Sequence, residues 1–207
     1  MKNEWRRIMY ICVEGVIGVG KTTLARMISD EFDFFSFLEV VEENPFLAKF
    51  YEDRERWAFQ TQLFFLLSRY SQQSELMKIL KAQRNAVSDY MFDKDRIFAN
   101  MNLVGEQMKL YDKVFKILDS KVPKPDLIIY LKASVQTLMK RIAMRDRVFE
   151  RNMDKEYISS LVIAYDDFFK RYEGKFITIN ADEVDFVQNR EDFELILKAI
   201  RESGVEL

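Results

Sequence analysis

The stretch Gly15-Val16-Ile17-Gly18-Val19-Gly20-Lys21-Thr22 decides the fold of this chain. It matches the phosphate-binding signature G-x-x-x-x-G-K-S/T at every fixed position, between a predicted strand over Tyr10 to Val13 and a predicted helix over Lys21 to Glu31. Glycines allow backbone N–H groups to turn toward phosphate oxygens, and a helix N-terminus adds partial positive charge. The sequence therefore predicts a nucleotide-binding loop, with a chance glycine turn as the alternative.

The same loop predicts contacts with the phosphates of ATP and with Mg²⁺. A lysine at its end is expected to reach the β- and γ-phosphates of ATP, and the threonine after it to hold Mg²⁺. An Asn-Lys-x-Asp segment, which would read guanine in a GTPase, is absent, and the chain is short for a motor ATPase, so a small kinase remains. The expected nucleotide-binding residues are Gly15, Val16, Ile17, Gly18, Val19, Gly20, Lys21, Thr22 and Thr23.

Short apolar runs alternate with long helical patterns along the rest of the chain. Further strands are predicted within Phe34 to Val41 and over Asn85 to Ser88, Leu127 to Leu131 and Phe176 to Ile179. Helices are predicted over Arg54 to Leu80, Phe98 to Leu118, Ser134 to Arg145, Lys155 to Tyr172 and Glu191 to Arg201. This alternation predicts a three-layer α/β/α fold with a five-stranded parallel sheet, of the P-loop kinase type. We expect one domain over residues 1–207, with a small arginine-bearing lid at about 141–151.

Composition excludes several classes of protein. The 207 residues carry a formal net charge of −2, so we expect no nucleic-acid polymer as a partner. No apolar run approaches the roughly 20 residues of a membrane span, and the short polar N-terminus does not resemble a signal peptide, so we expect a cytoplasmic protein without a membrane partner. The single cysteine, Cys12, lies in an apolar run and is expected to be buried and inert.

A carboxylate is the expected general base, because the sequence contains no histidine. Glu39 follows the second predicted strand, and the carboxyl end of a parallel strand faces the ligand crevice. Glu42 and Glu43 lie close by, so either could be confused with it, and three solvated acids in a loop are the alternative.

Two polar side chains interrupt an apolar, aromatic helix. Gln62 and Arg69 are seven residues apart, so they share one face of the predicted helix. A polar group on a buried face needs a partner, and a ligand would serve as one. The alternative is a helix that turns this side to water.

Three arginines within seven residues, Arg141, Arg145 and Arg147, follow a predicted strand–helix unit. Phosphoryl transfer places charge on the γ-oxygens, and guanidinium groups neutralise such charge. The pattern predicts catalytic arginines on a closing lid. A solvated basic helix end, favoured by the helix dipole, is the alternative.

Four segments in the order found here resemble the deoxynucleoside kinase family, which includes deoxycytidine, deoxyguanosine and deoxyadenosine kinases. The resemblance runs from about Tyr10 to Phe186, and the segments are Glu39-Val40-Val41, Tyr51 to Arg69, Ser88 to Ala99 and Arg141 to Glu150. It implies that Glu39 takes the proton of the sugar 5′-hydroxyl. It also implies substrate contacts by Glu39, Tyr51, Gln62, Arg69, Asp95, Phe98 and Glu150, and metal ligation by Thr22 and Asp89.

The sequence departs from the family pattern at Tyr90, where the family has an arginine that helps to hold the acceptor and the base glutamate. Lys94 and Arg96 are the candidates to supply the missing charge. The resemblance further implies a homodimer built through long helices, although core packing explains the aromatic residues of those helices equally well.

The expected activity is transfer of the γ-phosphate of ATP to the 5′-hydroxyl of a deoxynucleoside in nucleotide salvage, with a purine or cytosine base favoured. In the family, an arginine–aspartate pair such as Arg69 with Asp95 accompanies these bases and leaves little room for the methyl group of thymine. A nucleoside monophosphate kinase, such as a thymidylate kinase, is the nearest alternative enzyme. A non-catalytic nucleotide-binding scaffold is the alternative of a different class.

Overall fold

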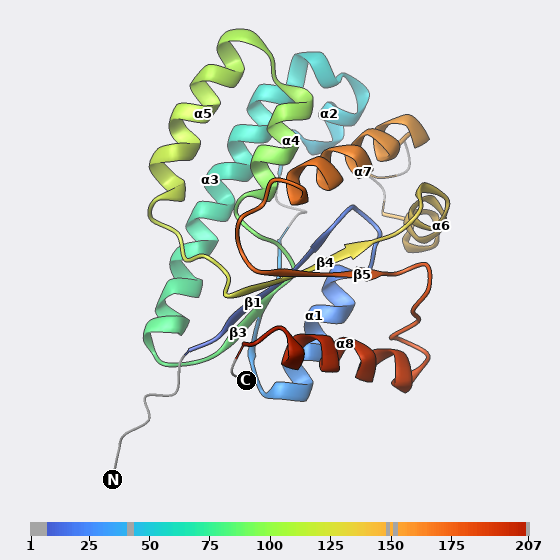
Figure 1. Cartoon of the computed structure of the whole chain (residues 1–207). Helices are drawn as coiled ribbons and strands as arrows, with labels where there is room; N and C mark the ends of the chain where they lie inside the picture. The colour runs from blue at the N-terminus through green and yellow to red at the C-terminus, as the bar shows by residue number, and fades with distance from the viewer. Residues whose placement is uncertain (1–7, 41–43, 148–149, 151–152, 206–207) are drawn as a thin grey trace.

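A computed structural model of the chain describes residues 8–40, 44–147, 150 and 153–205. Within these residues, five parallel strands form one sheet in the order β2-β3-β1-β4-β5 (Figure 1). The strands are β1 Tyr10–Gly15, β2 Phe35–Phe37, β3 Ala86–Ser88, β4 Leu127–Lys132 and β5 Phe176–Asn180. The expected α/β class and five-stranded parallel sheet are confirmed.

Helices cover both faces of this sheet (Figure 1). One face carries α1 Lys21–Phe32 and α8 Arg190–Glu202, and the other carries α3 Arg54–Lys81, α4 Lys94–Asn102, α5 Gly105–Asp119 and α7 Lys155–Phe169. The short helix α2 Leu47–Glu52 packs against α3, and α6 Val135–Arg145 follows the carboxyl end of β4.

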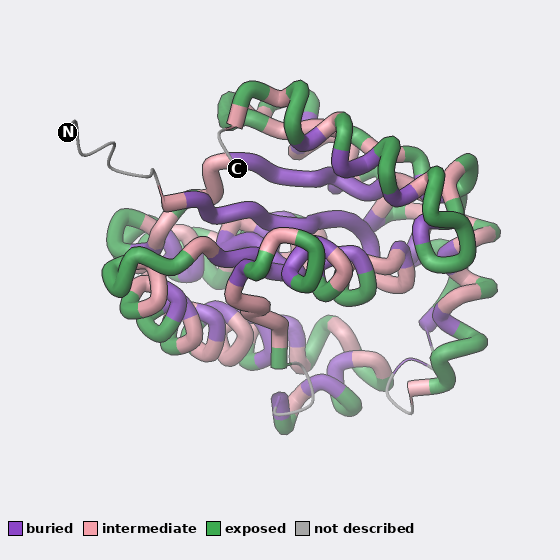
Figure 2. Tube along the Cα trace, turned by 90° about the horizontal axis from the view of Figure 1, so that it is seen from below, coloured by how far each residue is buried: buried purple, intermediate pink, exposed green. Residues whose placement is uncertain are grey.

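The two central strands form the core of the molecule. Every residue of β1 is buried, as are all residues of β4 before Lys132, because helices cover both faces of the strands (Figure 2). Their parallel register pairs Ile11 with Leu127 and Gly15 with Leu131, so both strands end at one edge of the sheet. Cys12 is buried in this core, as expected. The edge where the strands end therefore becomes the place for a ligand.

Four of the described helices begin at residues whose side chains accept a backbone hydrogen bond, among them α8, where Asn189 accepts from the N–H of Glu191 at 2.9 Å. Asp53 accepts from the backbone N–H of Arg56 at the start of α3, and Ser134 accepts from Thr137 at the start of α6. Asp154 accepts from the N–H of Tyr157 at 2.6 Å at the start of α7. Such caps satisfy N–H groups that have no partner inside a helix, and they explain where these helices begin.

The prediction of one helix over Phe98 to Leu118 is wrong, because the chain breaks between α4 and α5. Leu103 and Val104 are extended, and Gly105 follows with a φ of 57°. Leu103 is buried while Val104 is 81% exposed, so this turn places one side chain in the core and lets α5 start in a new direction. The apolar spacing continues through the break, which is why the sequence reads as one helix. Helix α2 was not predicted.

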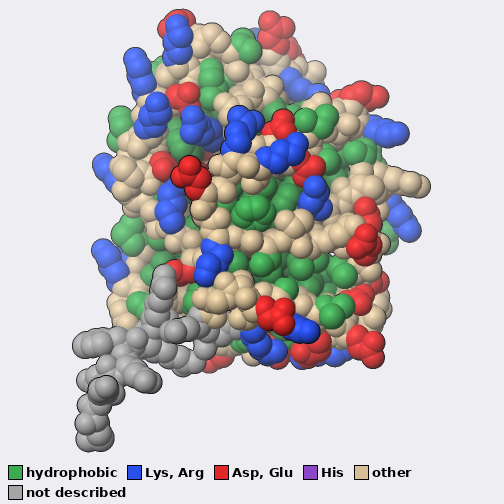
Figure 3. Space-filling model, in the orientation of Figure 1, with side chains coloured by type: hydrophobic (Ala, Val, Ile, Leu, Met, Phe, Trp, Pro, Cys, Tyr) green, Lys and Arg blue, Asp and Glu red, His purple; other side chains and the backbone are tan. Residues whose placement is uncertain are grey.

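The surface carries charges of both signs. In the face drawn in Figure 3, basic and acidic side chains are interspersed over the helices. Among the helices of the described residues, none combines the length and the apolar character that crossing a bilayer requires.

Candidate active site

A cavity of about 970 Å³ opens at the carboxyl ends of the strands. Its walls come from the glycine-rich loop, from Glu39 shortly after β2, and from helices α2, α3, α4 and α6. The segment 181–188, which follows β5, completes the wall beside the loop. Residues far apart in the sequence therefore meet around one space.

The glycine-rich loop is shaped by positions where a side chain has no room. Gly15 has a φ of 152°, and a Cβ atom there would lie 2.4 Å from the carbonyl oxygen of Leu131. Gly18 has a φ of 85°, and its Cβ would lie 2.8 Å from the side chain of Ile142 on α6. Glycine is required at both positions because the loop packs directly on β4 and α6.

Lys21 folds back over this loop. Its Nζ donates hydrogen bonds to the carbonyl oxygens of Gly15 at 2.8 Å and Val16 at 3.2 Å. Burial, assisted by the nearby charge of Lys94, lowers the pKa of Lys21 to about 8, although three acidic side chains act in the opposite direction. Lys21 therefore lines the cavity with its ammonium group placed among the loop carbonyls.

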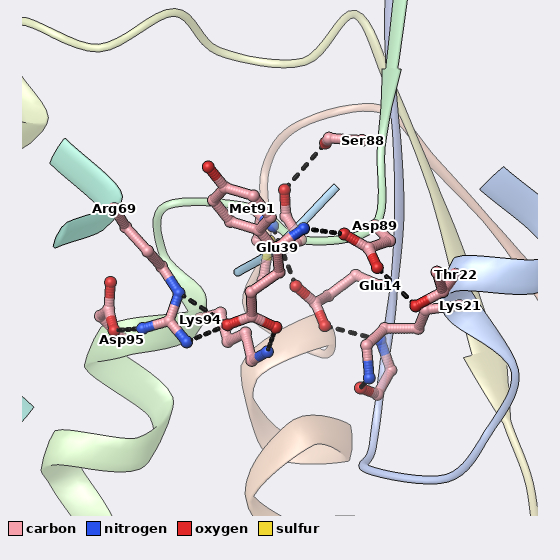
Figure 4. Close-up of polar contacts among 12 residues, drawn as sticks. Glu14, Lys21, Thr22, Glu39, Arg69, Ser88, Asp89, Met91, Lys94 and Asp95 are labelled. Atoms are coloured by element: carbon pink, nitrogen blue, oxygen red, sulfur yellow. Dashed lines mark hydrogen bonds and ion pairs between the residues drawn. The ribbon is translucent and has the colours of Figure 1, made fainter. Parts of the chain in front are cut away.

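Asp89, directly after β3, joins the loop to the opposite wall (Figure 4). One carboxylate oxygen accepts from the Thr22 hydroxyl at 2.5 Å, and the other accepts from the backbone N–H of Glu39 at 2.7 Å. Mg²⁺ prefers oxygen ligands and usually binds one or two protein groups together with phosphates and water. The Thr22 and Asp89 oxygens, side by side at the loop, are a donor set that fits this ion.

Four charged side chains form a compact group on the acceptor side of the cavity (Figure 4). Glu39 accepts from Arg69 Nε at 3.0 Å through Oε1 and from Lys94 Nζ at 2.7 Å through Oε2, and Arg69 also pairs with Asp95. The exposed fractions of these four side chains are at most 9%. We call Glu39, Arg69, Lys94 and Asp95 the acceptor-side charge group.

The two carboxyl groups of this group differ in their acidity. Burial opposes the ionisation of Glu39, but the charges of Arg69 and Lys94 outweigh it and hold the pKa of Glu39 well below its usual range. For Asp95, burial dominates and raises the pKa to about 7, with Glu39 adding to the rise and Arg69 opposing it. Asp95 Oδ2 is buried and has no hydrogen-bond partner among the described residues.

Lys94 provides the charge that the sequence lacks at Tyr90. Tyr90 is fully buried; its hydroxyl donates to Gln72 Oε1 at 3.1 Å and its ring lies 6.0 Å from that of Phe37. Arg96 instead approaches Asp112 at 3.5 Å, with a side chain that is 45% exposed. Of the two candidates, Lys94 is the one that contacts Glu39.

The remaining substrate-binding candidates form the wall next to this charge group. Gln62 and Arg69 are only 3% and 5% exposed, so the helix does not turn this face to water. Phe98 lines the cavity from α4, and Tyr51 lines it from α2 with its ring against Phe50. The structure thus places Tyr51, Gln62, Arg69, Asp95, Phe98 and Glu150 around the same cavity as Glu39.

The three arginines near the end of α6 differ from one another. Arg141 donates to the carbonyl oxygens of Val19 at 2.9 Å and Ala181 at 3.0 Å, so it holds the loop against segment 181–188. Arg145 donates to both carboxylate oxygens of the buried Glu150, and Arg147 lines the cavity. A solvated basic helix end does not describe these contacts. Parts of the expected lid, residues 148, 149 and 151, and the alternative bases Glu42 and Glu43 lie outside the described residues.

Glu14 is a buried acid beside the glycine-rich loop that the sequence interpretation missed, and it is not among the residues that line the cavity. It is fully buried, and its carboxylate accepts from the N–H groups of Gly15 at 2.8 Å and Met91 at 3.0 Å and from the Tyr165 hydroxyl at 3.1 Å. Burial raises its pKa, which Lys94 and Lys21 oppose. An acid in an otherwise apolar strand was the available signal. Segment 181–188 carries no comparable signal.

A phosphate-binding loop between a central parallel strand and a helix, with arginines on one side and a buried carboxylate on the other, defines a P-loop kinase. The model of the family "Deoxynucleoside kinase" matches residues 11–205. The chain therefore belongs to the deoxynucleoside kinase family, and it is an ATP-dependent phosphotransferase.

Similar proteins agree with this assignment. A deoxyguanosine kinase of Bacillus subtilis is 40% identical over 199 residues, which cover 93% of this chain and 96% of that protein. A deoxyadenosine kinase of Lactobacillus acidophilus is 31% identical, over 97% of this chain and 98% of its own. The solved structure of a deoxyadenosine kinase from M. mycoides with bound dATP superposes with a TM-score of 0.79 at 27% identity, covering 93% of this chain and 99% of that one.

Proposed function

We propose that this kinase transfers the γ-phosphoryl group of ATP to the 5′-hydroxyl of a purine deoxynucleoside, with deoxyguanosine as the preferred acceptor. The observation that carries the proposal is the acceptor-side charge group, which is balanced without a ligand. Arg69 and Lys94 supply two positive charges, Glu39 supplies one negative charge, and Asp95, whose pKa is raised to about 7, supplies a second one when it is ionised. A cavity wall of this kind suits an uncharged acceptor.

The same balance argues against a nucleoside monophosphate as acceptor. A monophosphate brings about two negative charges at neutral pH, and burying it beside Glu39 and Asp95 would require further cations. Both cations of the group already hold carboxylates. A deoxynucleoside brings only hydroxyl groups and a base, which need hydrogen-bond partners but no counter-charge.

In the proposed reaction the 5′-oxygen forms a bond to the γ-phosphorus while the bond to the bridging oxygen of ADP breaks. The proton of the 5′-hydroxyl passes to the carboxylate of Glu39. Lys21 binds the β- and γ-phosphates, Arg145 and Arg147 act on the transferred group from a lid at about 141–151 of a single domain, 1–207, and Arg141 keeps the phosphate loop and segment 181–188 in place for them. Thr22 and Asp89 would hold Mg²⁺, which neutralises phosphate charge when it is bound.

Two orphaned oxygens favour a base that carries N–H donors. Asp95 Oδ2 and the Thr61 hydroxyl are buried without hydrogen-bond partners among the described residues, and both residues line the cavity. Guanine offers ring and amino N–H groups, and the Gln62 amide can both donate and accept. We assign ring stacking to Phe98, and contacts with the sugar 3′-hydroxyl to Tyr51 and Glu150. The deoxyguanosine kinase name of the 40% identical relative supports the choice of base.

We also propose a homodimer formed through α3 and α5. Leu67 on α3 and Leu110 and Ile117 on α5 are 53%, 51% and 59% exposed, and the two helices pack side by side (Figure 1). Large exposed apolar side chains on neighbouring helices favour association. A cytoplasmic location remains a prediction from the sequence.

The proposed function is tested by measuring ADP formation with ATP and Mg²⁺ against the four deoxynucleosides and their monophosphates. We expect deoxyguanosine to give the highest kcat/KM and thymidine a value roughly a hundredfold lower, because a methyl group against a desolvated ion pair costs a few kcal/mol. Thymidine as the best acceptor would refute the argument from Arg69 and Asp95. Faster turnover of a monophosphate would establish the alternative kinase class, and no turnover at all would favour a scaffold.

A further inference from the structure

Each carboxylate oxygen of Glu39 is held by a different cation. Arg69 reaches Oε1 from the middle of α3, and Lys94 reaches Oε2 at 2.7 Å from the first residue of α4. Arg69 is shared with Asp95, whereas the one ion pair recorded for the Lys94 ammonium within the described residues is the contact with Glu39. Within the described residues, Lys94 therefore forms an ion pair with Glu39 alone, whereas Arg69 divides its contacts between Glu39 and Asp95.

Lys94 is also placed to act on the reacting end of the cavity. Its side chain is 7% exposed and lines the cavity, and its Nζ lies 5.9 Å from the centre of the Phe98 ring. Its charge contributes to the lowered pKa of Lys21, so the ammonium lies within electrostatic reach of the phosphate-binding loop. The Glu39–Lys94 pair thus stands between Lys21 and Thr22 on one side and Arg69 and Asp95 on the other (Figure 4).

Among the described residues, neither Tyr90 nor Arg96 substitutes for this charge. Tyr90 directs its hydroxyl to Gln72, and the Arg96 side chain pairs with Asp112 away from the cavity lining. Without Lys94, Oε2 of a nearly buried carboxylate would lose its only charged partner among the described residues. The carboxylate could then rotate or turn toward Arg69 with both oxygens, since side chains in such sites depend on their neighbours for orientation.

We propose that Lys94 is the positioning residue of the catalytic base: its ammonium group fixes the Glu39 carboxylate so that one lone pair faces the acceptor 5′-hydroxyl. This inference rests on the proposed function. In the step concerned, the 5′-oxygen bonds to the γ-phosphorus, ADP leaves with the electrons of the broken bond, and Glu39 receives the proton. Lys94 takes no part in bond making and keeps its own proton throughout.

A purely structural role for the ion pair makes a different prediction, which a double-mutant cycle separates. If Lys94 acts through Glu39, its replacement costs activity only while Glu39 can act as a base. In the Glu39→Gln background the second replacement should then have little further effect. If Lys94 merely stabilises the fold or contacts the phosphates independently, the reductions in activity of the two single variants should multiply in the double variant.

The experiment compares the parent protein with Lys94→Met, Lys94→Arg, Glu39→Gln and the double variant, at saturating ATP and deoxyguanosine. Methionine keeps roughly the length of the lysine side chain and removes its charge. Arg96→Met is the matched control, because it removes a positive charge two residues away on the same helix but outside the cavity lining. Thermal unfolding of every variant is measured alongside.

We expect Lys94→Met to lower kcat roughly 10- to 100-fold, with Lys94→Arg within about fivefold of the parent and Arg96→Met unchanged. The kcat of the double variant should lie within about twofold of that of Glu39→Gln alone. Multiplicative losses, near-normal kcat in Lys94→Met, or equal impairment of the Arg and Met variants would each overturn the proposal.

Two further outcomes of the experiment can be told apart from a failure of the proposal. If Lys94→Met fails to fold, the comparison of Glu39→Gln with the double variant still decides, because removing both members of the pair leaves no uncompensated charge between them. If the parent protein phosphorylates none of the deoxynucleosides, the proposed function fails before Lys94 is tested.

Discussion

The two halves of the cavity are built in contrasting ways. The phosphate side is one continuous run of residues after β1, and its shape comes from backbone conformation at Gly15 and Gly18. The acceptor side is assembled from side chains at the end of β2, in α3 and in α4, and its shape comes from ion pairs. Steric contacts of the backbone therefore shape the phosphate side, and ion pairs between side chains shape the acceptor side.

This difference shows which half of the cavity tolerates substitution of its residues. A Cβ atom at Gly15 would collide with a backbone oxygen, so the loop has no alternative residue at that position. A positive charge beside Glu39 can arrive from any element that reaches it. Lys94 at the start of α4 does so in a chain where Tyr90 occupies the position of the family's arginine. In such a site, the positive charge can come from a different position in the sequence, provided that its distance from the Glu39 carboxylate is kept.

The largest expected effect is on the phosphate side. Lys21→Ala should lower kcat/KM by a factor on the order of 10³ to 10⁵, because the Lys21 ammonium group lies at the carbonyls of Gly15 and Val16, where it is placed to meet the γ-phosphate charge. The fold should remain intact, since the partners of Lys21 are two loop carbonyls that a water molecule can satisfy. Steady-state kinetics and thermal unfolding check both parts, with the exposed Lys198→Ala as control. Retained turnover at saturating ATP would refute the loop assignment.

The next effect is on the acceptor side. Glu39→Gln should lower kcat roughly 10² to 10⁴-fold while ATP still binds, because the amide cannot accept the proton. Arg69 keeps its partner Asp95 in this variant, but the nearly buried Lys94 loses its ion-pair partner, so the unfolding temperature should fall as well as the activity. Rapid-quench measurement of product separates chemistry from binding. Glu42→Gln and Glu43→Gln are the comparison variants, and a larger loss in either would move the base to that residue.

A smaller effect is expected at Arg141, which joins the phosphate loop to segment 181–188. Arg141→Ala should raise KM for ATP roughly tenfold with a smaller change in kcat, because its two hydrogen bonds hold the loop against segment 181–188 before any chemistry takes place. Initial rates at varied ATP concentration provide the measurement. A fall in kcat at unchanged KM would instead indicate that Arg141 acts on the transition state.

The smallest effect is a pH dependence of ATP binding. The pKa of Lys21 is lowered to about 8 by burial, with Lys94 next in effect, so the ammonium loses its proton as pH rises through that value. Phosphate binds the charged form, and Kd for ATP should rise roughly fourfold between pH 7 and 8.5. Calorimetry in two buffers should show proton uptake at pH 8.5. Lys21→Arg keeps its charge, so proton uptake that persists in this variant would assign it to another group.

The contrast also explains which features of the fold and of the site could be predicted from the sequence. The loop, the five parallel strands and the face shared by Gln62 and Arg69 follow from contiguous patterns, and the structure confirms them. Tyr51, Asp95 and Phe98 were found through the resemblance, and the structure brings them to the same cavity. Their individual roles remain proposals.

Other features could not be predicted because they depend on tertiary contacts. The choice between Lys94 and Arg96 is decided by which way each side chain leaves α4, and two residues along a helix differ by about 200° in direction. The break at Leu103 and Val104 is invisible to apolar spacing, since Leu103 remains buried on either reading. Segment 181–188 reaches the cavity only because β5 lies beside β4 at the edge of the sheet.

The close approach of Gly15 to Leu131 has a consequence for redesign of the enzyme. Libraries aimed at new acceptors can diversify α3 and the start of α4, where contacts are made by side chains that can be exchanged in compensating pairs. The seam between β1 and β4 offers no such freedom, because the obstructing atom belongs to the main chain and is present whatever residue occupies position 131. Substitutions that change the acceptor are therefore expected to be tolerated on α3 and at the start of α4, and not at the seam between β1 and β4.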